Sequence, residues 1–253
     1  MAISTFQRRE VKFLMSLDQY EALLPIVHAH MEPDRYCVDG KEYGIYNLYY
    51  DTPTDLLIRR SIVKPYYKEK LRLRSYYSPA DPDQSVFLEV KKKIGGIVTK
   101  RRVSMTVAEA EAYVLTRVKP YYERFIDQQV IREMDVFLNH YDSVAPRQFI
   151  GYQRSAFFGK DNPEFRLTFD RDITERRYDL SLTKGNYGGK IIREDQRLME
   201  IKVPGSIPLW MSEALSEIGI RRVSFSKYGR AYKKFIQNAG VEHPQEERKA
   251  FYA

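Results

Sequence analysis

Residues 66–77 read Tyr-Tyr-Lys-Glu-Lys-Leu-Arg-Leu-Arg-Ser-Tyr-Tyr, and this stretch is the strongest indication of the fold. Lysine or arginine stands at every even position from Lys68 to Arg74, with Leu71 and Leu73 between them. Because alternate residues of a β-strand share one face, the pattern predicts a strand with four cations on one side. Leu71 and Leu73 point to its other side.

Four other segments alternate in the same way, and in each one the charged residues share a face. The charged sets are Glu10 with Lys12, Glu89 with Lys91 and Lys93, Arg166 with Asp170, and Glu200 with Lys202. Any one such strand is typical of a sheet with one solvated face. Taken together the strands favour a different interpretation, because neighbouring like charges on a sheet repel and the acids here occur singly. The set indicates a face that binds a polyanion, especially if the sheet closes with that face inside.

The remaining periodicity predicts an α+β protein built on a mainly antiparallel sheet. Strands are expected at residues 8–14, 43–51, 66–77, 85–94, 97–105, 148–157, 164–178, 190–194 and 197–203. Helices are expected near residues 16–27, 106–114, 124–139, 208–218 and 227–237. Capping boxes at Ser16 with Gln19 and at Thr106 with Glu109 mark two helix starts, and Gly95-Gly96 marks a hairpin turn. We expect residues 1–253 to form a single domain, with a core of about 6–237 and a tail of 238–253.

Composition limits the classes of function that remain. The 253 residues carry 42 Lys and Arg against 34 Asp and Glu, which gives a net charge of +8 and a pI near 9.3. This basic surplus leaves nucleic acid, a membrane surface and polyphosphate open as partners. The single cysteine, Cys37, excludes an internal disulfide and a cysteine-based metal site. The sequence has no run of 18 apolar residues and no apolar leader, which predicts a cytoplasmic protein without a transmembrane segment.

Phosphate chemistry accounts for the residue types on the charged face. The arginine fork binds two phosphate oxygens at once, and phosphoryl transfer depends on positioned cations and a divalent metal. Glutamates that stand singly among cations suit Mg²⁺ or Mn²⁺, which prefer oxygen ligands. The sequence contains no P-loop, no Gly-x-Gly-x-x-Gly motif and no zinc-ligand pattern. The basic strands are therefore the feature expected to bind phosphate.

Nine short segments, in this order, resemble the VTC domain, the catalytic domain of the fungal vacuolar transporter chaperone polyphosphate polymerase. The segments are RREVKF (8–13), YNLYYDTP (46–53), IRRSI (58–62), EKLRLRSYY (69–77), FLEVKKK (87–93), VTKRRV (98–103), FRLTFD (165–170), LMEIKVP (198–204) and SFSKY (224–228). That domain belongs to the triphosphate tunnel metalloenzyme superfamily, with the CYTH-type adenylyl cyclases. The resemblance covers about residues 6–237. It implies a closed or nearly closed, eight-stranded antiparallel β-barrel tunnel with flanking helices.

The resemblance also implies roles for individual residues. Those matched to catalytic positions are Lys12, Arg72, Arg74, Lys91, Arg166 and Lys227. Those expected to bind phosphate, by the same match or by sharing a strand face, are Arg60, Lys70, Lys100, Arg102, Arg176 and Ser226. Arg59 competes with Arg60, and Arg177 competes with Arg176, where strand parity with Arg166 favours Arg176. Glu200 matches the metal-binding glutamate, and Glu10 is a second candidate ligand.

The function implied by the resemblance is that of a polyphosphate polymerase. Such an enzyme would transfer the γ-phosphate of ATP to a polyphosphate chain, with Mn²⁺ or Mg²⁺ as cofactor. Two alternatives would use the same residues: a triphosphatase acting on inorganic or organic triphosphates, and a non-catalytic module that binds polyphosphate or inositol phosphates. A nucleic acid partner is not expected, although the pairs Tyr66-Tyr67 and Tyr76-Tyr77 flank the basic strand in a way that leaves RNA as a ligand to test.

Overall fold

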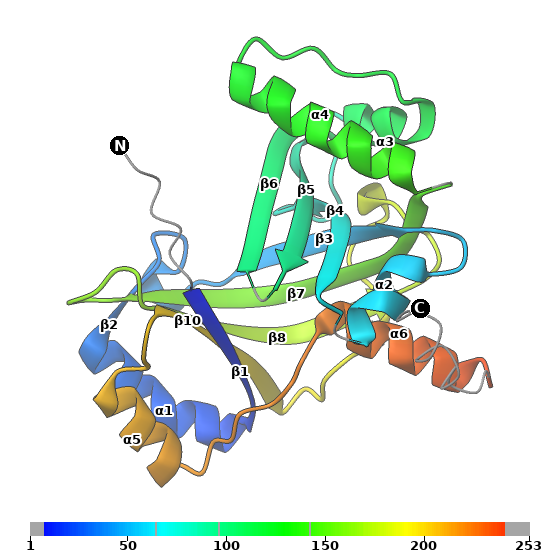
Figure 1. Cartoon of the computed structure of the whole chain (residues 1–253). Helices are drawn as coiled ribbons and strands as arrows, with labels where there is room; N and C mark the ends of the chain where they lie inside the picture. The colour runs from blue at the N-terminus through cyan, green and yellow to red at the C-terminus, as the bar shows by residue number, and fades with distance from the viewer. Residues whose placement is uncertain (1–7, 64, 96, 142, 241–253) are drawn as a thin grey trace.

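The computed structural model describes residues 8–63, 65–95, 97–141 and 143–240. Its centre is an antiparallel sheet in the order β1-β10-β8-β7-β3-β4-β5-β6, to which β2 adds by pairing with β7 and β9 by pairing with β8 (Figure 1). The strands are β1 (Arg8–Ser16), β2 (Met31–Pro33), β3 (Tyr43–Asp51), β4 (Tyr67–Ser75), β5 (Ser85–Ile94), β6 (Ile97–Thr106), β7 (Ala145–Gly159), β8 (Arg166–Arg176), β9 (Gly189–Lys190) and β10 (Gln196–Pro204). The sequence analysis predicted all of these strands except β2 and β9. It expected a strand at 190–194, but the only part of that range in a strand is Lys190, the last residue of β9.

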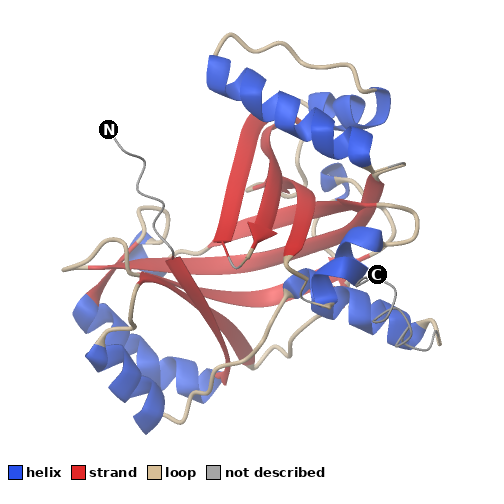
Figure 2. Cartoon of the chain, in the orientation of Figure 1, coloured by secondary structure: helices blue, strands red, loops and turns tan. Residues whose placement is uncertain are grey.

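Helices flank the sheet in three groups, α1 with α5, α3 with α4, and α2 with α6 (Figure 2). They are α1 (Leu17–His30), α2 (Leu56–Ile62), α3 (Val107–Thr116), α4 (Phe125–His140), α5 (Leu209–Glu217) and α6 (Lys227–Asn238), with short 3-10 turns at Val38–Gly40 and Leu182–Lys184. The five predicted helices are confirmed, and both predicted capping boxes form. Only α2 was not predicted.

The alternation in β4 sorts its side chains onto two faces as predicted. Leu71 and Leu73 are fully buried in an apolar cluster that α3 and α4 complete. On the other side, the register sets Arg72 beside Glu89 of β5, and Glu89 beside Arg102 of β6. We call the side of the sheet that carries Arg72 and its charged neighbours the basic face.

The sheet has the predicted antiparallel strands and flanking helices, but it is not closed into a barrel. Among the described residues, β1 and β6 do not pair with each other. The outer edge of β1 is contacted by the segment before α6: Val223 N donates to Lys12 O at 2.8 Å, and Phe13 forms a bridge with Arg222. This contact attaches the segment that leads into α6 to the middle of β1, so that part of the edge is not open to another strand.

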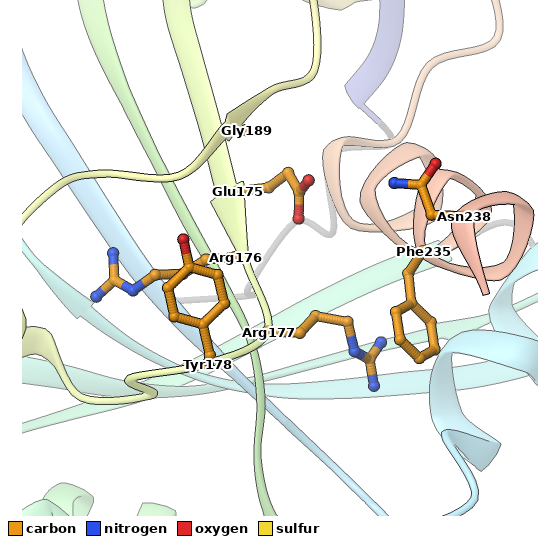
Figure 3. A pocket seen from close by; sticks show the side chains of 7 residues that line it. All are labelled: Glu175, Arg176, Arg177, Tyr178, Gly189, Phe235 and Asn238. Carbon is orange, nitrogen blue, oxygen red and sulfur yellow. The ribbon is translucent and has the colours of Figure 1, made fainter.

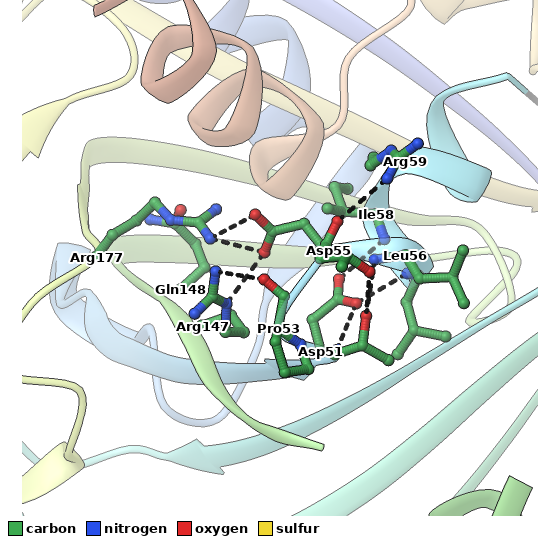
Figure 4. A network of polar contacts seen from close by, with 12 residues as sticks. Asp51, Pro53, Asp55, Leu56, Ile58, Arg59, Arg147, Gln148 and Arg177 are labelled. Atoms are coloured by element: carbon green, nitrogen blue, oxygen red, sulfur yellow. Dashed lines mark hydrogen bonds and ion pairs between the residues drawn. The ribbon is translucent and has the colours of Figure 1, made fainter. Parts of the chain in front are cut away.

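Asp51 takes part in a network of polar contacts around the start of α2 (Figure 4), and it also contacts α6. Asp51, at the end of β3, is fully buried and accepts hydrogen bonds from Leu57 N at 2.8 Å and Ile58 N at 2.9 Å. It also accepts one from the hydroxyl of Tyr228 on α6, at 2.9 Å. Because one carboxylate satisfies both the start of α2 and a tyrosine of α6, it fixes the two helices at the same end of the basic face.

Candidate phosphate-binding site

The basic face collects charged side chains from seven strands and from the first residue of α6. Its cations are Lys12, Lys68, Lys70, Arg72, Arg74, Lys91, Lys93, Lys100, Arg102, Arg154, Arg166, Lys202 and Lys227, and its acids are Glu10, Glu89, Asp170 and Glu200. Lys91 on β5 interacts electrostatically with Glu10 on β1, and Lys70 on β4 with Lys12 on β1. These strands are not neighbours in the sheet. The basic face is therefore curled so that its two ends approach each other.

Arg72 and Arg74 are each held in place through the Nε atom of the guanidinium group. Arg72 Nε lies 2.6 Å from Glu89 Oε2, and one of its terminal nitrogens lies 3.4 Å from the Tyr49 hydroxyl. Arg74 Nε donates to Asn47 Oδ1 at 2.9 Å. Over the part of the chain that the structure describes, the terminal nitrogens of Arg74 have no protein partner. They remain available to donate to an anion, in the forked geometry that suits phosphate.

Glu89 is the acid that organises this pair of arginines. It is 1% exposed, and besides Arg72 it contacts Lys100 at 3.3 Å and Arg74 at 3.8 Å. Burial raises the pKa of Glu89, but the charges of Arg72 and Arg74 outweigh burial and bring the pKa down to about 2. The carboxylate is thus ionised at any physiological pH, and it positions the arginines.

A second group of charges joins β1, β7, β8 and β10 to α6. Glu200 Oε1 lies 3.2 Å from Lys12 Nζ and 3.4 Å from Lys227 Nζ. Lys227 also pairs with Asp170, which is fully buried and accepts two hydrogen bonds from Arg154, at 2.6 and 2.7 Å. Cations and carboxylates therefore alternate in one continuous chain of contacts that ends at Arg154.

Both carboxylates in this chain are ionised for the same physical reason. Burial raises the pKa of Glu200, but the charges of Lys227 and Lys12 hold it well below its usual range. Burial likewise raises the pKa of Asp170, and the charges of Arg154 and Lys227 bring it below its usual range. Burial lowers the pKa of Lys227, whereas the two carboxylates raise it above that of a free lysine.

Glu200 and Glu10 are the residues that fit a divalent metal. Both contact the same ammonium, because Glu10 lies 3.1 Å and Glu200 lies 3.2 Å from Lys12 Nζ. No group of three or more His, Cys, Asp or Glu residues suited to a metal occurs within the described ranges. Two converging carboxylates nevertheless suit Mg²⁺ or Mn²⁺, since Mg²⁺ is usually bound through one or two carboxylates together with substrate phosphates.

Among the residues that the structure describes, no carboxylate forms an ion pair with Lys70, and the charged groups nearest to it are all cations. Over the described chain its contact is with the ring of Tyr228, whose centroid lies 5.6 Å from Nζ. The charged groups around it are Lys68, Lys91, Lys12 and Arg72. Burial, reinforced by these like charges, lowers the pKa of Lys70 to about 7. The amine is therefore only partly protonated at neutral pH.

We expect tripolyphosphate to bind more weakly as the pH rises above 7. The protonated form of Lys70 pairs with the anion and the neutral amine does not. Binding above pH 7 therefore takes up a proton, and affinity falls by up to about tenfold per pH unit. Titration calorimetry across this range, in buffers of different ionisation enthalpy, measures both the slope and the proton uptake. Lys70→Arg, which stays charged, should lose this part of the slope, and equal slopes in the two proteins would contradict the prediction.

Several further predicted residues share the basic face. Lys91 lies between Lys70 and Lys100 in the register, which puts three lysines in a row across β4, β5 and β6. Arg102 is exposed beside this row, and Arg166 is exposed on β8. The structure brings these residues to one face, and their contact with phosphate stays a prediction.

Two predicted residues lie at the margin of the site. Ser226 is the N-cap of α6 and accepts a hydrogen bond from Gly229 N at 3.1 Å, so its part in the site is to start the helix that carries Lys227. Arg60, on α2, interacts electrostatically with Tyr141, which donates to Glu69 on the opposite face of β4 at 2.8 Å. The phosphate contact expected of Arg60 stays a prediction.

The phosphate contact predicted for Arg176 is wrong. Arg176 is 1% exposed, its guanidinium donates to backbone carbonyls of residues 179–187, and it lies 3.7 Å from the ring centroid of Phe149. Figure 3 shows Arg176 and Arg177 leaving the strand in opposite directions, with Arg177 pointing toward Phe235 of α6. A surface pocket of about 170 Å³ lies between these side chains and α6. Arg176 is a structural residue that holds its own loop.

The error has a local cause in β8. The register with β7 shifts between Gly151 and Gln153, and Asp172 has a φ of +51°. Such a bulge adds a residue to one strand, so that the side chains beyond it exchange faces. Parity counted from Arg166 therefore fails after Asp172. The rival Arg177 forms an ion pair with Asp55 at 2.7 Å (Figure 4), and within the described ranges it forms no ion pair with the carboxylates of the basic face.

The sequence analysis named none of Asp170, Glu89 and Arg154 as a site residue, although these three orient the cations of the site. Asp170 lies four residues after Arg166 on the same face of β8, and Glu89 lies two residues before Lys91 on β5. The alternation therefore placed them correctly. Their partners, however, come from other elements of the chain and could not be read from the pattern.

The sequence matches the family described as VTC domain over residues 7–236, and the chain therefore belongs to the VTC domain family. A candidate adenylate cyclase from Bacillus halodurans shares the fold, with a TM-score of 0.52 at 14% identity over 87% of this chain and 95% of that one. A candidate adenylyl cyclase from Hippeastrum, described as having a dominant triphosphatase activity, aligns with a TM-score of 0.45 at 15% identity over 94% and 98% of the two chains. No curated protein is a significant match. Of the helices described, none is long and apolar enough to cross a membrane.

Proposed function

We propose that the protein is a phosphotransferase of the polyphosphate polymerase type, which transfers the γ-phosphate of ATP to a polyphosphate chain on the basic face. The observation that carries the proposal is the curled face itself, where Arg72 and Arg74 share one surface with Lys12 and Lys227. Its cations outnumber its carboxylates, so a ligand with several negative charges is the one that balances them. Membership of the VTC domain family supports the same ligand class.

This reaction depends on the positions and charges of the protein side chains more than on covalent chemistry by the protein. The bond from the γ-phosphorus to its bridging oxygen breaks, ADP leaves, and a new bond forms to a terminal oxygen of the chain. In this scheme Arg72 and Arg74 hold the phosphates in line, and Lys91 balances charge beside them. Lys227, held by Asp170 and Glu200, offers its ammonium at a fixed place. These groups act by stabilising negative charge where it develops.

Glu200 and Glu10 would hold Mn²⁺ or Mg²⁺. When bound, the metal would neutralise negative charge on the phosphoryl oxygens. Lys12 contacts both carboxylates and so fixes their positions relative to each other. Glu200 is held ionised by Lys227 and Lys12, which keeps it ready to serve as a ligand at neutral pH.

Incubation of the purified protein with ATP and Mn²⁺ tests the proposal. We expect ADP and long-chain polyphosphate to appear, and we expect turnover to drop by at least about tenfold in Glu200→Ala, because the substitution removes a metal ligand. Glu217→Ala, which removes the same charge from an exposed position on α5, should change nothing. The idea fails if no polyphosphate forms. Release of orthophosphate from tripolyphosphate without chain growth would identify the triphosphatase alternative instead.

A further inference from the structure

A row of aromatic rings crosses the basic face beside the arginines. The ring centroids of Tyr36 and Tyr43 are 6.1 Å apart, those of Tyr43 and Tyr76 are 6.1 Å apart, and those of Tyr76 and Phe87 are 6.2 Å apart. The guanidinium of Arg102 lies 4.5 Å over the ring of Phe87 and ends the row. We call these four aromatic residues the aromatic row.

The aromatic row is not part of the hydrophobic core. Tyr36, Tyr76 and Phe87 belong to none of the three buried clusters, and only Tyr43 packs against one of them. Tyr36 is 60% and Tyr76 is 39% exposed. Phe87 stands on the same strand face as Glu89 and is partly exposed among charged residues. Apolar rings in such a place do not contribute to core packing, and grouped exposed apolar side chains are typical of binding surfaces.

The row lies next to the residues proposed to bind phosphate. Phe87 is the register partner of Arg74, whose terminal nitrogens are available. At the other side of the row, Tyr43 lies opposite Arg154 in the register and interacts with it electrostatically. Flat aromatic faces beside phosphate-binding cations are the combination that binds a nucleotide, because the base stacks on rings while its phosphates pair with arginine and lysine.

We propose that the aromatic row is a stacking platform for the nucleobase of a nucleoside triphosphate whose phosphates lie on the basic face. The proposal rests on the proposed phosphate-binding function and adds to it a recognition site for the part of the substrate that a polyphosphate chain lacks. Within the aromatic row, Phe87 of β5 is the register partner of Arg74, and Tyr76 follows the end of β4 two residues after Arg74. Stacking is tolerant of base identity, so the site distinguishes a nucleotide from an inorganic triphosphate more than one base from another.

The experiment compares the binding of ATP and of inorganic tripolyphosphate by titration calorimetry, with a chelator present so that neither is turned over. Phe87→Ala and Tyr76→Ala are each expected to raise the Kd for ATP by about tenfold, the loss expected when one stacked ring is removed. The Kd for tripolyphosphate should change by less than about twofold, since it has no base to stack. Phe87→Tyr, which keeps a ring, should retain ATP binding.

Tyr77→Ala is the matched control, because Tyr77 is 59% exposed, adjoins Tyr76 and is not a member of the aromatic row. It should leave both dissociation constants unchanged. Unchanged tripolyphosphate binding shows at the same time that a variant is folded, and Tyr76→Ala removes an exposed ring if Phe87→Ala does not fold. Equal weakening of both ligands, or no weakening of ATP, would overturn the stacking platform alone. Failure of the unaltered protein to bind tripolyphosphate would overturn the proposed function, and the platform with it.

Discussion

Replacing Arg72 by alanine should weaken the binding of tripolyphosphate by on the order of 100-fold, as expected when one partner of a desolvated, charge-assisted pair is removed. The Arg72 side chain is only 19% exposed, so water competes little for its hydrogen bonds. The substitution also leaves Glu89 with only Arg74 and Lys100 as partners, and the carboxylate then repels the anion with one cation fewer beside it. Lost attraction and added repulsion act in the same direction.

Arg101→Ala is the control for total charge. Arg101 lies one residue before Arg102 on β6, points away from the basic face, and pairs with Glu133 of α4 at 3.6 Å. Its removal changes the net charge by the same amount and should weaken binding by less than about threefold, through the long-range field alone. Calorimetric titration of both variants at one fixed ionic strength makes the comparison. Similar losses in the two variants would show that diffuse charge, and not a site at Arg72, attracts the anion.

The arrangement of the basic face could be predicted from the sequence because strand alternation is a local property. The even positions of 68–74 share a face whatever the rest of the chain does, and the apolar residues between them choose which face is buried. The register then brings Arg72 to Glu89 and Glu89 to Arg102, which are the pairs that the alternation of three separate strands would suggest. Where strands are regular, pattern and structure agree.

Prediction failed where the backbone departs from regular geometry. One bulge near Asp172 was enough to move Arg176 off the basic face, since a shift of one residue exchanges the faces of a strand. Helix α2 was missed for a related reason. Its start depends on Asp51, which belongs to the preceding strand, and its N-cap Asp55 has a φ of +56°, so no ordinary capping pattern marks it. The contact of residues 222 and 223 with the edge of β1 likewise joins distant parts of the chain, and no local pattern predicts it.

The pairs that orient the site depend on contacts between distant parts of the chain. Lys227 was predicted from the resemblance of its segment, SFSKY (224–228), to the family motif, but its partner Asp170 is 57 residues away in the sequence. Alternation shows that Asp170 faces the cations, and only the position of α6 shows which cation it holds. Sequence therefore supplied the members of the charged chain, and tertiary structure supplied their pairing.

Asp170→Asn should lower the free energy of unfolding by about 3–5 kcal/mol at neutral pH, the cost of breaking a buried ion pair by removing one partner. Asp170 is fully buried, and the side chains of Arg154 and Lys227 that it holds are 11% and 9% exposed. The amide keeps the shape of the carboxylate and removes its charge, so two buried cations would share Glu200 as their nearest acid. Urea denaturation of the two proteins measures the difference. Asp83→Asn, at an exposed position, should cost less than about 0.5 kcal/mol.

The pH dependence of this difference separates loss of charge from loss of packing. The pKa of Asp170 is lower in the folded protein than in the unfolded chain, where it is about 3.9. The ionised carboxylate therefore contributes its full stability above about pH 5, and this contribution is lost as the pH falls through the lowered pKa of the folded state. We expect the gap between the wild-type protein and Asp170→Asn to be constant from neutral pH down to about 5 and to narrow below that. A gap of under about 1 kcal/mol at neutral pH, or one that acid does not narrow, would mean that the charge of Asp170 does not hold Arg154 and Lys227 in place.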